Sequence, residues 1–95
     1  MLPPLVKMVH KIILHGKVQG VFYRKSAKIE ADRLGVFGWV RNKDDGTVEV
    51  LAAGDKNSLE KFINWCKVGS PFAEVKKIEI EEIKTSQEFD KFEII

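Results

Sequence analysis

The sequence predicts an α+β fold in which two helices cover one face of a mainly antiparallel sheet. Stretches typical of strands and helices follow one another in the order βαββαβ, with a short extra strand at the C-terminus. Right-handed crossovers make the first two strands parallel, and the third strand fits antiparallel between them. Ninety-five residues with 44% hydrophobic and 32% charged content suit a single core. This arrangement is a ferredoxin-like βαββαβ sandwich.

The first two elements are a strand and a helix. Residues 9–15 are predicted to form a strand with apolar side chains on both faces around Ile13, as expected of a central strand. A helix is expected over residues 23–34, and Gly35 stands where a C-terminal cap belongs. The apolar residues of this helix share one face: Tyr23, Ala27, Ala31 and Leu34.

A hairpin is expected next. Residues 36–42 and 47–53 are rich in β-forming side chains, and the Lys-Asp-Asp-Gly sequence at 43–46 between them is a turn signal. Gly54 and Asp55 end the second strand of this pair, and Asp55 or Asn57 can cap the helix that follows.

The last part of the chain predicts a second helix and two strands. The helix has the clearest amphipathic pattern in the sequence, with apolar residues at i, i+3, i+4 and i+7: Leu59, Phe62, Ile63 and Cys66. Residues 69–71, Gly-Ser-Pro, end it. A fourth strand is expected over 75–83, and the alternation in 89–95 predicts a short fifth strand.

Composition limits the functions to consider. A net charge of +2 with interspersed signs disfavours a nucleic-acid protein that binds through bulk positive charge. No 18-residue apolar run or signal-peptide region is present, so no membrane association is expected. The single Cys66 is compatible with a cytoplasmic location. We expect residues 1–8 to be an N-terminal extension and residues 9–95 to form one domain that acts as a monomer.

One glycine-containing stretch joins the first strand to the first helix: Gly16-Lys17-Val18-Gln19-Gly20-Val21-Phe22-Tyr23-Arg24. Gly16 and Gly20 permit positive φ and a close approach of the backbone to a ligand. Backbone N–H groups and the positive end of the helix dipole point at one place, and Arg24 adds a planar cation suited to phosphate. The residues alone leave two interpretations equally open. One is an anion-binding loop, and the other is an ordinary connection with a surface arginine.

Two motifs decide between these interpretations. The pattern Gly16-x-Val18-Gln19-Gly20-Val21-x-Tyr23-Arg24 resembles the first signature of the acylphosphatase family. A second pattern, Gly38-Trp39-Val40-Arg41-Asn42-x-x-x-Gly46-x-Val48 followed by Gly54, resembles the other signature of that family. The similarity extends over nearly the whole chain, and it implies the same ferredoxin-like fold.

The resemblance also implies an activity and a set of site residues. The activity is hydrolysis of the carboxyl–phosphate bond of a small-molecule acyl phosphate, with no cofactor, no metal and no phosphoenzyme. By this resemblance Arg24 binds the substrate phosphate and Asn42 positions the attacking water. The phosphate-binding loop comprises Gln19, Gly20, Val21, Phe22, Tyr23 and Arg24. Inorganic phosphate and sulfate are expected to inhibit.

Topology and chemistry agree with that activity. The loop follows the first strand and Asn42 ends the second, so both lie at carboxyl ends of parallel strands, where open sheets bind ligands. Asn42 cannot act as a general base, but its amide can orient water. The loop contains no cysteine nucleophile, and no cluster has metal-ligand spacing. Such a sparse site suits a mixed anhydride, because a carboxylate leaves readily.

Other functions remain to be weighed. A non-catalytic anion-binding or accessory module of the same fold is the main alternative, since related domains occur inside larger carbamoyl-handling maturation proteins. An RNA-binding module is disfavoured, because Phe37 and Trp39 share a strand face but the RNP1 pattern is absent. His15 is expected to flank the site without acting as acid or base, and His10 to lie on a strand face.

Overall fold

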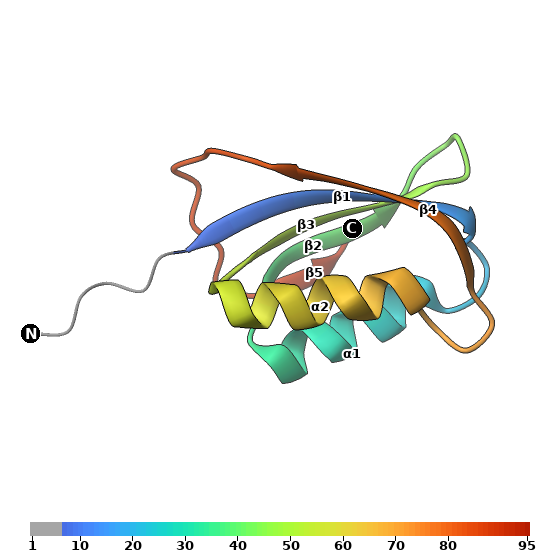
Figure 1. The fold of residues 1–95 in the computed structure, drawn as a ribbon, viewed down its shortest axis with the longest axis horizontal. Coiled ribbons are helices and arrows are strands. Elements are labelled where there is room, and N and C mark those ends of the chain that lie inside the picture. The colour runs from blue at the N-terminus through green and yellow to red at the C-terminus, as the bar shows by residue number, and fades with distance from the viewer. Residues whose placement is uncertain (1–6) are drawn as a thin grey trace, which may run out of the picture.

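The strands of the computed structural model, which describes residues 7–95, lie in the order β4-β1-β3-β2-β5, and two helices pack on one face (Figure 1). The elements are β1 (Met8–Lys17), α1 (Tyr23–Leu34), β2 (Phe37–Asn42), β3 (Val48–Gly54), α2 (Lys56–Val68), β4 (Glu74–Glu82) and β5 (Phe92–Ile94). All strand pairs are antiparallel except β2 with β5. The predicted ferredoxin-like sandwich is therefore confirmed.

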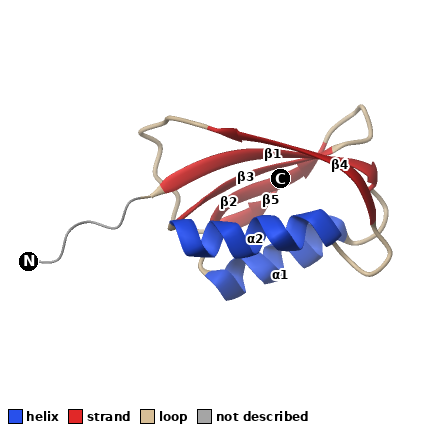
Figure 2. Ribbon diagram, viewed as in Figure 1, coloured by secondary structure: helices blue, strands red, loops and turns tan. Residues whose placement is uncertain are grey.

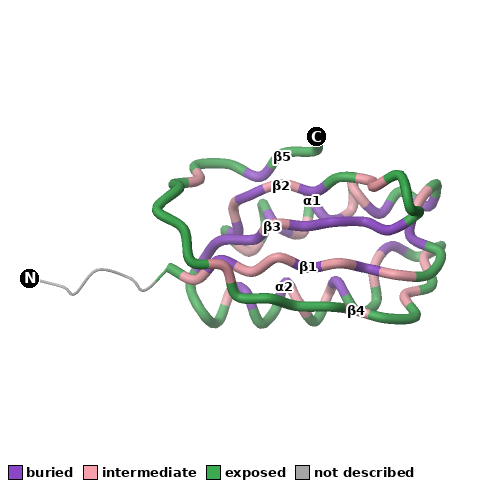
Figure 3. The backbone as a smooth tube through the Cα atoms, turned by 90° about the horizontal axis from the view of Figure 1, so that it is seen from above, coloured by how far each residue is buried: buried purple, intermediate pink, exposed green. Residues whose placement is uncertain are grey.

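Within residues 7–95, both helices lie on one face of the sheet and neither covers the opposite face (Figure 2). Register places Ile12 of β1 opposite Val50 of β3, and Val50 opposite Val40 of β2, so these side chains lie side by side under the helices. Buried positions accordingly gather along β3, the middle strand (Figure 3). The helices contribute the apolar faces expected from their periodicity: Tyr23, Ala27 and Ala31 from α1, and Leu59, Phe62 and Cys66 from α2.

The uncovered face differs from the prediction for β1. We expected residues 9–15 to be apolar on both faces around Ile13, but Ile13 is only half-buried because no helix covers it. Long charged side chains shield this face instead. The carboxylate of Glu49, 3% exposed, pairs with Arg41 at 2.6 Å and Lys11 at 3.2 Å, and the Arg41 guanidinium lies 5.5 Å from the Trp39 ring centroid.

The bounds of β1 also differ from expectation. β1 continues through Lys17, with a register shift between His15 and Gly16, so Gly16 belongs to the strand. A Cβ at Gly16 would lie 2.2 Å from the Glu74 carbonyl oxygen. The close approach that this glycine permits is therefore to β4, and our assignment of it to the ligand loop is wrong.

The C-terminal strand is shorter than predicted. β5 covers Phe92–Ile94, within the expected 89–95, and pairs in parallel with β2 from Gly38 to Val40. Of the expected extension 1–8, residues 1–6 lie outside the described part of the chain, and Met8 is the first residue of β1, where it pairs with Gly54 of β3. Within residues 7–95, none of the helices has the length and apolar character needed to cross a bilayer.

Candidate active site

A pocket of about 340 Å³ opens where β1 and β2 end and α1 begins. Its lining brings together Arg24, from the first turn of α1, and Asn42, the last residue of β2. β3 lies between the two parallel strands in the sheet. The full lining is Val18, Gly20, Phe22, Tyr23, Arg24, Lys25, Asn42 and Ile94.

The N-terminus of α1 is left available to an anion. Among the described residues no side chain caps it, and no acidic residue stands in its first turn. By contrast, the Asp55 carboxylate caps α2 by accepting a hydrogen bond of 2.9 Å from the Ser58 N–H. Because the first backbone N–H groups of a helix lack intrahelical partners and carry partial positive charge, the open end of α1 can bind phosphate.

Arg24 adds a full positive charge at this end. Its side chain is half-buried, and within residues 7–95 no carboxylate forms an ion pair with it. The other two arginines are paired, Arg33 with Glu30 and Arg41 with Glu49. Arg24 and Lys25 line a pocket that has no acidic residue in its lining. The pocket is therefore suited to a negatively charged ligand.

Asn42 presents an unsatisfied acceptor. Its Oδ1 atom is buried and has no hydrogen-bond partner among the described residues. Leaving a buried polar atom unpaired costs about 1–3 kcal/mol, so such an atom is expected to find a donor in a water or a ligand. The β2 register, which pairs Asn42 with Val48, places its side chain on the same face as Val40, under the helices.

The predicted loop residues divide into two groups. Gly20, Phe22, Tyr23 and Arg24 line the pocket, whereas Gln19 and Val21 do not. The Gln19 amide donates to the Lys43 and Thr47 carbonyls, at 2.7 and 2.8 Å. This side chain therefore ties the loop to the β2–β3 turn that follows Asn42.

Val21 is held in place by Ser70, which follows α2. Its side chain is buried, and its carbonyl accepts a hydrogen bond of 2.6 Å from the buried Ser70 hydroxyl. Sequence reasoning missed Ser70, because the Gly-Ser-Pro at 69–71 was interpreted only as the end of α2. It also missed Lys25 and Ile94, which line the pocket without belonging to a recognised motif.

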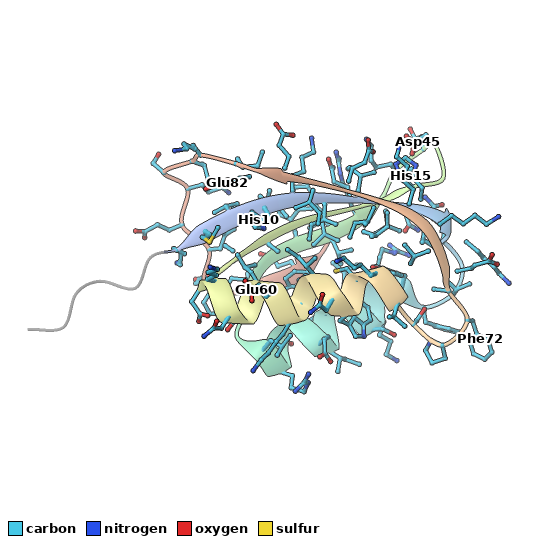
Figure 4. All side chains as sticks on the ribbon, viewed as in Figure 1. His10, His15, Asp45, Glu60, Phe72 and Glu82 are labelled. Atoms are coloured by element: carbon cyan, nitrogen blue, oxygen red, sulfur yellow. The ribbon has the colours of Figure 1, made fainter. Side chains whose placement is uncertain are left out.

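The remaining titratable candidates lie elsewhere. His15 pairs with Glu79 at 2.7 Å on the uncovered side of the sheet and does not line the pocket (Figure 4). Burial raises the pKa of the Cys66 thiol to about 12, so this cysteine is not a nucleophile at neutral pH. Among residues 7–95, no group of three or more His, Cys, Asp and Glu side chains is placed to hold a metal ion.

Comparisons with known proteins point in one direction. The family model described as Acylphosphatase matches residues 10–94. An acylphosphatase from Acaryochloris marina is 44% identical over 95 residues, covering 100% of this chain and 99% of the relative. The crystal structure of the Bacillus subtilis acylphosphatase superposes with a TM-score of 0.89 at 41% identity, covering 93% of this chain and 98% of that one. Full-length HypF shares the fold, with a TM-score of 0.89 at 23% identity over 12% of its length.

Proposed function

Since the chain belongs to the acylphosphatase family and is an acylphosphatase enzyme, we propose that it works by direct attack of a water on the phosphorus of an acyl phosphate. The new bond joins the water oxygen to phosphorus, and the bond from phosphorus to the carboxylate oxygen breaks. The carboxylate leaves with the bonding electrons, and the protons of the water pass to the products. The products are a carboxylate and inorganic phosphate.

Arg24 and the uncapped N-terminus of α1 hold the phosphate. Together they supply one full charge and the backbone N–H groups at the start of the helix. This assignment accounts for a pocket that contains cations and no acid. Phosphoryl transfer to water mainly requires such positioning and charge neutralisation when the leaving group is a carboxylate.

Asn42 orients the attacking water, and one observation carries this role. The buried Oδ1 atom has no donor among residues 7–95, and Asn42 lines the same pocket as Arg24. A water bound to phosphate-loaded enzyme would satisfy that atom by donating a hydrogen bond to it. The alignment of the water matters mainly as its bond to phosphorus forms. Asn42 should therefore act on turnover more than on phosphate affinity.

Paired substitutions test these two roles. Arg24→Ala should weaken phosphate binding and reduce kcat severely, and Arg24→Lys should also suffer because an ammonium cannot reproduce the bidentate fork. Asn42→Ala should lower kcat by roughly two to three orders of magnitude, about 3–4 kcal/mol, by analogy with the loss of one preorganised hydrogen-bonding group. Calorimetric phosphate titrations beside steady-state kinetics on benzoyl phosphate provide both readouts.

The matched control is Asn64→Ala, which removes an exposed amide on α2 and should leave both readouts unchanged. If Asn42→Ala lost phosphate affinity as completely as Arg24→Ala, the water-positioning role would be wrong.

Single turnover in ¹⁸O-labelled water adds a test of the route, since the label should enter phosphate. Label in the carboxylic acid would instead indicate attack at the acyl carbon.

The proposed route requires no metal, so hydrolysis should continue in excess chelator. Loss of activity that Mg²⁺ restores would contradict it. Inability of the purified chain to hydrolyse any acyl phosphate, with phosphate binding intact, would favour a non-catalytic anion-binding module.

We further propose that the protein is a cytoplasmic monomer. The free, buried thiol of Cys66 supports the cytoplasmic location. A single species of about 10.8 kDa in solution would support the monomer.

A further inference from the structure

We propose that Phe22 and Ile94 form an apolar wall that contacts the acyl group of the substrate and favours aromatic over small acyl groups. This inference rests on the proposed function, because it assigns the part of the pocket that the phosphate does not fill. Both side chains line the pocket together with Arg24 and Asn42. They come from separate segments, the β1–α1 loop and β5.

Neither side chain is required by the core. Phe22 is 68% exposed and Ile94 is 42% exposed, and both lie outside the buried cluster. An aromatic side chain that is two-thirds exposed gains little from folding. A ligand that covered it would recover that hydrophobic contribution.

The backbone conformation of Phe22 also supports a role for this residue in ligand binding. Its φ of 63° places it in the left-handed region, and it is the one residue other than glycine with positive φ among those described. Glycine or asparagine would adopt this conformation at lower cost. Residues held in such strained conformations gather at active sites and ligand sites. The chain thus keeps a phenylalanine at the mouth of the pocket despite its cost to stability.

The position of the wall fits the geometry of an acyl phosphate. The charged groups Arg24 and Lys25 and the open end of α1 attract the phosphate, so the acyl end must point away from them. Phe22 and Ile94 supply the exposed apolar surface of the lining, since the other large apolar residues there, Val18 and Tyr23, are each 1% exposed. A flat ring can pack against Phe22, whereas a methyl group covers little of it.

The test compares kcat/KM for benzoyl phosphate with kcat/KM for acetyl phosphate in the full chain. Using the ratio of the two values in each variant cancels differences in reactivity and any common loss of activity. Phe22→Ala should lower the benzoyl-to-acetyl ratio by at least about threefold relative to the unsubstituted chain, as expected for one lost aromatic contact. Ile94→Ala should lower the benzoyl-to-acetyl ratio by a smaller factor. The ratio in Phe22→Leu should lie between that of Phe22→Ala and that of the unsubstituted chain.

Phe72→Ala is the matched control, because Phe72 is also 68% exposed but projects from the α2–β4 connection and does not line the pocket (Figure 4). Its ratio should equal that of the unsubstituted chain. An unchanged ratio in both Phe22→Ala and Ile94→Ala would overturn the inference while leaving the proposed function intact. An unsubstituted chain that hydrolysed neither compound would instead overturn the proposed function.

Phe22→Gly provides a second, independent readout. Removing the strained side chain should raise the melting temperature and at the same time lower the benzoyl-to-acetyl ratio, because the residue favours binding at the expense of stability. A melting temperature that fell, with the ratio unchanged, would assign Phe22 a structural role and contradict the wall.

Discussion

Tyr23 shows how one residue joins the site to the core. It begins α1, lines the pocket and is 1% exposed, and its hydroxyl donates a hydrogen bond of 2.7 Å to the Cys66 carbonyl. Cys66 lies in the last turn of α2, where carbonyl groups lack intrahelical partners. Burial raises the pKa of the phenol, which therefore stays protonated and able to donate.

Tyr23→Phe should consequently reduce stability without abolishing the chemistry. The Cys66 carbonyl would be left buried and unpaired, so the free energy of unfolding should fall by about 1–2 kcal/mol. Urea unfolding followed by circular dichroism measures this change, and steady-state kinetics should show a much smaller effect than Asn42→Ala. An equally large loss of kcat would mean that the hydroxyl acts in the pocket.

The sequence predicted some of the residues that line the pocket and not others. Arg24 and Asn42 could be predicted because the motifs and the parallel strand ends place them at one edge of the sheet. The directions of Gln19 and Val21 could not, because they depend on hydrogen bonds to Lys43, Thr47 and Ser70, which are remote in sequence. In a loop without periodicity, only such partners decide which side chains face the ligand.

Among the elements, β3 carries a charge in an unusual place. Glu49 is nearly buried on the uncovered face, between Arg41 of β2 and Lys11 of β1. Burial alone would raise the pKa of this carboxyl. The hydrogen bonds and charges from Arg41 and Lys11 outweigh burial, and the pKa lies below its usual value. The central strands are thus joined by an ion-pair network on the face that no helix covers.

Glu49→Gln should reduce stability in a pH-dependent way. A lowered folded-state pKa means that the carboxylate stabilises the fold above its unfolded pKa, and that this contribution disappears as pH falls through the folded pKa. We expect a loss of about 1–2 kcal/mol at pH 7, because the half-exposed Arg41 and Lys11 remain solvated after the substitution. Urea midpoints of both proteins should converge as the pH falls below the usual pKa range of a glutamate carboxyl, where the folded-state carboxylate becomes protonated. A constant difference would show that packing, not charge, is responsible.

The elements themselves were largely predictable. Periodicity located both helices, and Gly35 and Asp55 cap them as expected. The lengths of β1 and β5 were not predictable, since a strand extends as far as its neighbours offer partners. Lys17 of β1 pairs with Glu74 of β4, and the ring centroids of Phe92 of β5 and Phe62 of α2 lie 5.7 Å apart. These neighbours are fixed by the fold and not by the local sequence.

For the whole molecule, the pocket is an assembly of distant segments. Its lining comes from the β1–α1 loop, the first turn of α1, the end of β2 and β5, and Ser70 of the α2–β4 connection holds the loop through the Val21 carbonyl. A ligand that binds this pocket contacts segments that separate on unfolding. Binding should therefore be coupled to global stability, because a ligand bound only by the folded state shifts the unfolding equilibrium.

Inorganic phosphate should accordingly raise the melting temperature. At about one hundred times its Kd it adds about 2.7 kcal/mol, which corresponds to a rise of roughly 11–22 °C for a domain of this size. Arg24→Ala should lose most of that rise, because the phosphate then loses its principal cation. Arg33→Ala, at the other end of α1 and paired with Glu30, should keep it. Differential scanning calorimetry in phosphate, in sulfate, and in chloride of equal ionic strength separates binding from screening. Equal shifts in Arg24→Ala and Arg33→Ala would place the anion outside the pocket.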